Sequence, residues 1–145
     1  MGYKINKEKL KKFINIALES GFHDEESARD HLSDVVNNFN KLTDPVTLYR
    51  LIFLSKKSDL NKEELGSHYV LNKKMLISSH YDKMLYDYSK NENSKPFILT
   101  ITVDKNKIDF DETITNNLMY PHEEEITLKN KGKGANIISL EELKR

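Results

Sequence analysis

The first forty residues carry apolar positions at the spacing of amphipathic helices. Apolar side chains recur every three or four residues over 7–20, and Gly21 follows, where a left-handed residue commonly ends a helix. Asp24 can cap a second segment, whose apolar stripe continues to about Leu42. The pattern therefore predicts two helices at the N-terminus.

Beyond Pro45 the pattern changes to that of strands. The segment 46–54 is rich in β-branched and aromatic residues and is short for a helix, which predicts a buried strand. Further strands are predicted at 68–70, 74–78, 96–103, 123–128 and 135–140, with 107–110 extending or following the third of these. A short helical segment is expected at 61–65 and a helix from Ser79. Helices followed by mixed strands predict an α+β fold.

The length and the charge balance narrow the possibilities. A chain of 145 residues buries about 68–70% of its unfolded surface, which is enough for one compact domain. We expect a single domain over 1–145, with a helical part at 1–44 and a strand-rich core at 45–145. Lys plus Arg number 23 and Asp plus Glu number 23, so no net charge favours nucleic acid or an anionic membrane as a partner.

Other absences exclude several classes of site. The chain has no cysteine, which excludes disulfides, thiolate zinc sites and cysteine nucleophiles. The five histidines show no ligand-like spacing, so no metal site is predicted. No apolar run is long enough to span a membrane, and the first residues lack the apolar segment of a signal peptide. We therefore expect a cytoplasmic protein without a membrane partner.

Arg50 and a pair of glutamates are the most informative polar residues. Arg50 lies inside an apolar strand of a chain whose basic residues are almost all lysines. A guanidinium offers a rigid two-point contact to diphosphate or ribose oxygens that lysine cannot reproduce. Glu123 and Glu125 lie on one face of their predicted strand, about 6.6–7 Å apart along the backbone. Two like charges this close are unfavourable unless a cation, a hydroxyl or catalysis uses them.

These segments form a familiar series. Leu-Tyr-Arg at 48–50, Ile-Ser-Ser at 77–79 and Glu-x-Glu at 123–125 resemble, in that order, the Arg, Ser-Thr-Ser and Glu-x-Glu motifs of the Arg-Ser-Glu class of mono-ADP-ribosyltransferases. The resemblance covers about 46–140, and the segments 65–69 and 117–126 also look like small bacteriophage members of this family. Gly-Ser-His-Tyr at 66–69 is an alternative to 77–79 for the middle motif.

The resemblance implies a fold, a substrate and a reaction. The fold would be an ADP-ribosyltransferase-like split small β-sheet with an N-terminal helical pair, and 45–145 would be an NAD-binding, transferase-like core. The chain would transfer ADP-ribose from NAD⁺ to a macromolecular acceptor, with a host protein arginine as the leading expectation, and would release nicotinamide. If the chain is phage-encoded, it would act in the host cytoplasm.

The resemblance also assigns the two acidic residues their roles. Breaking the bond between nicotinamide and ribose builds positive charge on the sugar, as in glycoside hydrolysis. By resemblance, Glu125 would bind the ribose 2′-hydroxyl and stabilise that charge. Glu123 would position or deprotonate the acceptor.

The remaining site residues would bind NAD⁺. Arg50, with Tyr49 beside it, would hold diphosphate or ribose oxygens. Ser78 or Ser79 would keep Glu125 in its working rotamer. His68 or Tyr69 would stack on the nicotinamide half or hydrogen-bond to it.

Each of these residues also has a structural interpretation. An arginine in a strand is commonly an ion-pair partner, consecutive glutamates are commonly a solvated strand edge, and adjacent serines commonly cap a helix. The main alternative is therefore an inactive module that keeps the transferase fold and binds or inhibits a host protein. Hydrolysis of NAD⁺, with water as the acceptor, is a third possibility.

Overall fold

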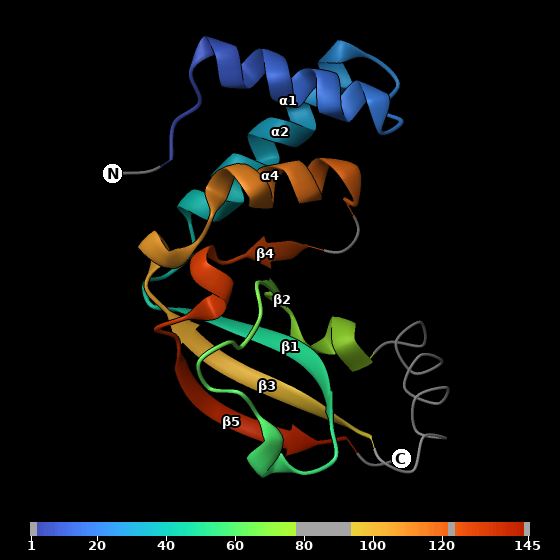
Figure 1. The fold of residues 1–145 in the computed structure, drawn as a ribbon. Coiled ribbons are helices and arrows are strands. Elements are labelled where there is room, and N and C mark those ends of the chain that lie inside the picture. The colour runs from blue at the N-terminus through green and yellow to red at the C-terminus, as the bar shows by residue number, and fades with distance from the viewer. Residues whose placement is uncertain (1–2, 78–93, 122–123, 144–145) are drawn as a thin grey trace.

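The computed structural model describes residues 3–77, 94–121 and 124–143. Within them lie three α-helices, α1 (Lys7–Glu19), α2 (Glu25–Asn40) and α4 (Phe110–Met119), which lie together on one side of the molecule (Figure 1). A five-stranded sheet forms the other side. The predicted α+β class is confirmed.

The three helices share one capping arrangement. The side chain of the residue before each helix, Asn6, Asp24 or Asp109, accepts a hydrogen bond from a backbone N–H of the first turn. This bond satisfies one of the N–H groups that have no partner inside the helix. The two predicted N-terminal helices form at their expected positions for this reason.

All neighbouring strands in the sheet are antiparallel. The strands are β1 (Val46–Leu54), β2 (His68–Val70), β3 (Lys95–Val103), β4 (Glu125–Thr127) and β5 (Asn136–Glu142). Their order across the sheet is β4-β2-β1-β3-β5. The short strand β2 therefore lies between β1, which carries Arg50, and β4, which begins at Glu125.

The main hydrophobic core lies between the helices and one face of the sheet. Leu48 and Leu99 of the sheet and Ile114 and Leu118 of α4 are fully buried there. Figure 1 shows α4 running between α1 and β4, and α1 packs on both α2 and α4. The N-terminal helical pair thus reaches the sheet partly through α4. A smaller cluster, which includes Val70, covers the opposite face of the sheet.

The helix α4 corrects one sequence expectation. The segment 107–110 was expected to extend or follow the preceding strand, but a 3₁₀ turn at Lys105–Lys107 comes after the strand and α4 begins at Phe110. The side chain of Asp109 accepts from the N–H of Glu112 at 3.1 Å and so favours the helix start.

Two shorter segments also differ from expectation. The predicted strand at 74–78 is a 3₁₀ helix at Lys73–Ile77, which Asn72 begins by accepting from the N–H of Lys74 at 2.9 Å. The segment 61–65 is a turn in which the Asn61 side chain accepts from the N–H of Glu63, rather than a helix. These local side-chain bonds offer the backbone an alternative to regular structure. The helix predicted from Ser79 lies outside the described residues.

No helix in the described ranges combines the length and the apolar character needed to cross a bilayer.

Candidate functional site

Arg50 lies in the middle of β1, and its side chain packs against residues of the segment 66–69. Its Nη1 donates to the backbone carbonyl of His68 at 3.4 Å, and its Cζ lies 5.8 Å from the centroid of the Tyr69 ring. Its Nε is buried and has no hydrogen-bond partner among the described residues. A buried donor without a partner is costly, and an anionic oxygen brought to it would remove that cost.

Gly66 lies directly against the guanidinium of Arg50. Its φ is +101°, and a Cβ at this position would stand 2.2 Å from Nη1 and 2.5 Å from Cζ. The N–H of Gly66 donates to the carbonyl of Lys131 at 3.0 Å, so the loop between β4 and β5 supports the Gly66 backbone. Glycine is required here by both the backbone conformation and the contact.

Tyr69 forms the other side of the Arg50 environment. Its side chain is buried, and its hydroxyl donates to the carbonyl of Leu65 at 3.1 Å. Burial raises the pKa of Tyr69 to about 12, although the charge of Arg50 acts in the opposite direction. The hydroxyl therefore stays protonated at neutral pH and remains a donor.

Glu125 is held at the start of β4. Its backbone carbonyl accepts from Nδ2 of Asn117 in α4 at 2.7 Å. Its carboxylate, which is 18% exposed, contacts Nδ1 of His68, whose side chain is 60% exposed. The contact between these two side chains bridges β4 and β2.

The register of the sheet separates Arg50 from Glu125. Tyr49 pairs with Val70 and Val70 pairs with Glu125, so these three side chains leave the sheet on one face. Arg50 follows Tyr49 and lies over Tyr69, on the other face. The structure thus brings the two strands to either side of β2, but it does not direct Arg50 and Glu125 into one cleft.

The structure describes some of the other predicted site residues and leaves others outside its described ranges. Of the two segments considered for the middle motif, 66–69 includes the first two residues of β2, the strand between those of Arg50 and Glu125. Ser78, Ser79 and Glu123 lie outside the described residues. Tyr49 packs beside Val70 in the smaller hydrophobic cluster.

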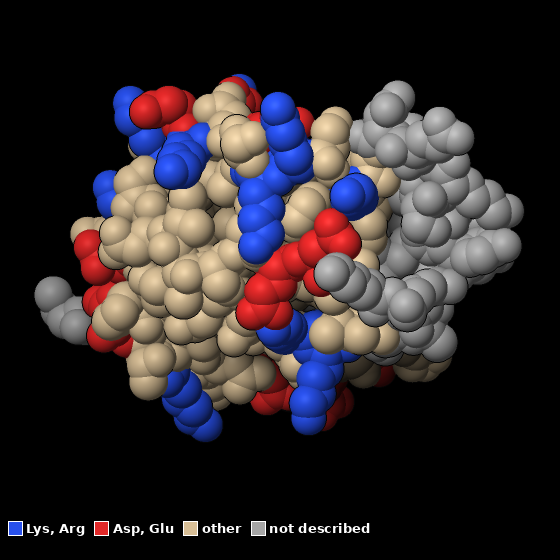
Figure 2. All heavy atoms as spheres, turned by 90° about the horizontal axis from the view of Figure 1, so that it is seen from below, with Lys and Arg blue, Asp and Glu red and all other residues tan. Residues whose placement is uncertain are grey.

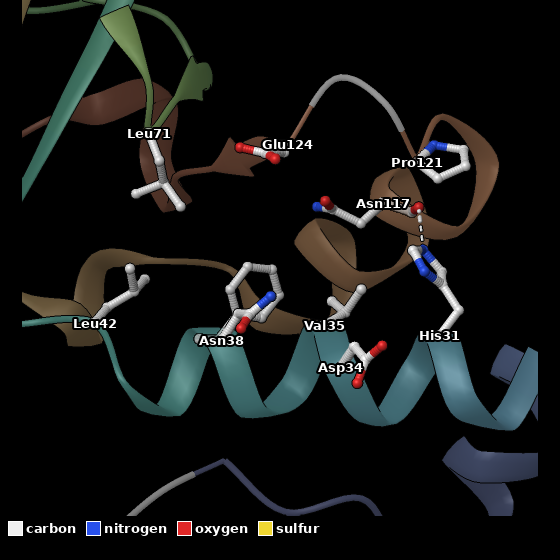
Figure 3. Close-up of a pocket in the computed structure, with 10 residues that line it drawn as sticks. His31, Asp34, Val35, Asn38, Leu42, Leu71, Asn117, Pro121 and Glu124 are labelled. Carbon is white, nitrogen blue, oxygen red and sulfur yellow. Dashed lines mark hydrogen bonds between the residues drawn. The ribbon is translucent and has the colours of Figure 1, made fainter.

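A cavity between α2 and α4 was not expected from the sequence (Figure 3). Its volume is about 380 Å³, and Asp34 and Asn38 of α2, Asn117 of α4 and Glu124 contribute polar groups to its lining. Neither Arg50 nor Glu125 lines this cavity, and neither lines the hollows beside Leu10 and Arg29. The only available sequence signal was the placement of His31 on the apolar side of α2, because Asn117 and Glu124 join it only through the tertiary fold.

The described residues contain no group of three or more His, Asp or Glu side chains arranged to hold a metal ion. On the face shown in Figure 2, acidic and basic side chains are interspersed and do not gather into a patch of one sign. Comparison with protein-family models, with curated proteins and with solved structures returned no match.

Proposed function

We propose that the chain is a mono-ADP-ribosyltransferase that transfers ADP-ribose from NAD⁺ to a host protein, with an arginine as the acceptor. The observation that carries this proposal is the arrangement β4-β2-β1, in which His68 contacts both Arg50, through its carbonyl, and Glu125, through its imidazole. Arg50, His68 and Glu125, which are far apart in the sequence, thus lie on three adjacent strands.

The residues on either side of β2 suit the two halves of NAD⁺. Arg50 has a permanent charge and a buried Nε without a described partner, which fits a diphosphate oxygen. Glu125 has a largely enclosed carboxylate, which fits stabilisation of a positively charged ribose. Because the two side chains leave opposite faces of the sheet, the proposal requires NAD⁺ to bind around the end of the short strand β2, or β2 to shift on binding.

The proposed reaction exchanges one bond at the ribose C1′ for another. The bond to the nicotinamide nitrogen breaks, and its electron pair leaves with nicotinamide. A guanidinium nitrogen of the acceptor then forms a bond to C1′ and loses a proton, for which Glu123 is the proposed base. Glu125 remains ionised throughout and acts by charge and by orienting the sugar.

The direct test is incubation with NAD⁺ labelled in its adenylate half and a host lysate, with nicotinamide release measured in parallel. We expect a labelled macromolecule from the unaltered protein, and we expect Glu125→Gln to lower both signals about 10²–10³-fold. Glu63→Gln, at an exposed loop carboxylate, is the matched control and should retain both signals. If the unaltered protein releases no nicotinamide and labels nothing, the transferase proposal is wrong.

A second function, a non-catalytic module that binds a host protein, is favoured by the opposite-face placement of Arg50 and Glu125. Thermal unfolding with and without NAD⁺ separates the two. A transferase that binds NAD⁺ should gain about 2.7 kcal/mol in unfolding free energy at one hundred times the dissociation constant. An inactive module without a dinucleotide site should show no change in melting temperature at any NAD⁺ concentration.

A further inference from the structure

The cavity between α2 and α4 combines an apolar floor with a polar rim. Val35 and Phe39 of α2 are buried residues of its lining. Leu42 and Leu71 lie at one end (Figure 3). Its volume of about 380 Å³ falls within the range of small-molecule sites, which are mostly apolar with a few placed polar groups. The cavity therefore has the size and the floor of a site for a side chain or small ligand.

Two of the polar groups around this floor are acidic. Asp34 and Glu124 each contribute a carboxylate, and no lysine or arginine belongs to the lining. Figure 3 shows Glu124 and Asn117 extending over the space above α2 from the opposite wall. Carboxylates from two different parts of the chain therefore line the cavity.

The backbone of the rim is fixed by specific contacts. Glu124 has a φ of +46°, which is uncommon for a residue with a side chain. Nδ2 of Asn117 donates to the carbonyls of Thr113 and Glu125 at 2.8 and 2.7 Å. Nε2 of His31 donates to the carbonyl of Asn117 at 3.2 Å. Asn117 is thus held between α2 and the start of β4, and these bonds fix the positions of the two cavity walls relative to each other.

These features select a guanidinium over other cations. A guanidinium is planar, weakly hydrated and carries several donors in a fixed fork, so it can bind carboxylate and amide oxygens while its faces lie against apolar groups. An ammonium is a compact, strongly hydrated charge and gains less from a half-apolar cavity. We propose that this cavity binds an arginine side chain presented by a partner protein.

This site is distinct from the proposed catalytic carboxylate. Glu124 lines the cavity, whereas the Glu125 carboxylate contacts His68. The bound arginine would therefore be a recognition contact and not the group that is modified. The inference does not depend on transferase activity, because a binding module could use the same cavity.

The test measures binding of N-acetyl-L-arginine N-methylamide to the full chain by amide chemical shifts in NMR. We expect saturable shifts at residues of the cavity, such as Val35 and Asn117. The counterpart containing citrulline, which has the same shape but no charge, should bind about fivefold more weakly or worse, as expected for loss of exposed ion pairs. The lysine counterpart should also bind more weakly.

Variants of the rim complete the experiment. The double variant Asp34→Asn with Glu124→Gln should weaken binding of the arginine probe about fivefold, because both carboxylates are exposed and can be replaced without burying a new group. Asp30→Asn, at an exposed position of α2 outside the lining, is the control and should bind as the unaltered chain does. Equal binding of arginine and citrulline probes, unchanged binding by the folded double variant, or equal binding of lysine would overturn the proposal. NAD⁺-dependent labelling is measured separately, so failure here leaves the transferase proposal standing.

Discussion

His68 and Glu125 meet across β2 and β4, with Nδ1 of the imidazole against the carboxylate. The carbonyl of the same histidine accepts from Arg50 on the other face of the sheet. His68 therefore contacts both of the residues that the proposed function assigns to NAD⁺ binding. A substitution of His68 removes the imidazole that contacts Glu125 and leaves the carbonyl that contacts Arg50 in place.

Removing the His68 side chain should affect Glu125 more than the fold. The His68 side chain is 60% exposed, so His68→Ala should change the unfolding free energy by no more than about 0.5 kcal/mol. If the imidazole positions Glu125, we expect kcat for nicotinamide release to fall about tenfold, which corresponds to about 1.4 kcal/mol in the barrier. The KM for NAD⁺ should change little, and His68→Asn should restore part of the rate. An equal loss in kcat and in melting temperature would instead indicate a structural role.

Adding a methyl group at Gly66 should displace the guanidinium of Arg50. Gly66→Ala places a Cβ 2.2 Å from Nη1, whereas Gly21→Ala, at a similarly positive φ of +109°, meets nothing within 4 Å. Both variants carry the backbone strain of about 1 kcal/mol or more, so Gly21→Ala is the matched control. We expect only Gly66→Ala to weaken NAD⁺ binding, by about tenfold if one charge-assisted contact is lost. Equal NAD⁺ affinity in the two variants would contradict the role proposed for Arg50.

The sequence predicts an element correctly where one property, such as apolar periodicity, determines that element. The first two helices have apolar stripes and Asn or Asp caps, so their helical period can be seen in the sequence. The buried face of α4 includes Thr113 and Asn117 as well as Ile114 and Leu118. Because two of these four residues are polar and the segment contains several β-branched residues, apolar periodicity does not predict this helix.

The site was harder to predict because its geometry depends on long-range pairing. The residue pattern predicted the strands that carry Arg50, His68 and Glu125, but it could not show that β2 lies between β1 and β4, nor that the register turns Arg50 and Glu125 to opposite faces. A shift of one residue in register exchanges the two faces of a strand, and no local pattern fixes that shift in a three-residue strand. The cavity beside Glu124 likewise arises from helix packing alone.

The helix that the sequence did not predict should contribute strongly to stability. Leu118 of α4 is fully buried, whereas the next residue, Met119, is 41% exposed. Leu118→Ala should lower the unfolding free energy by about 2–5 kcal/mol, because it removes buried contacts and leaves a cavity. Met119→Ala should change it by no more than about 0.5 kcal/mol. Urea denaturation measures both, and similar losses in the two variants would mean that α4 does not pack on this face.

Asp111 of α4 contacts the N-terminal segment, and the stabilisation from this contact should depend on pH. The carboxylate accepts from the Tyr3 hydroxyl and lies 3.0 Å from Nζ of Lys9. Burial acts to raise the pKa of Asp111, but the hydrogen bonds from Tyr3 and Lys9 and the charges of Lys9 and Lys12 together lower it. A folded-state pKa below the unfolded value means that the ionised carboxylate stabilises the fold at neutral pH, and that this stabilisation is lost as pH falls through the folded-state pKa.

Because the side chains of Lys9 and Asp111 are about half exposed, Asp111→Asn should lower the unfolding free energy by no more than about 1 kcal/mol at neutral pH. The difference from the unaltered protein should begin to shrink near the ordinary aspartate pKa of about 4 and disappear below the folded-state value. Unfolding free energies measured as a function of pH test this, and a difference that stays constant into strong acid would show that Asp111 does not act through its charge.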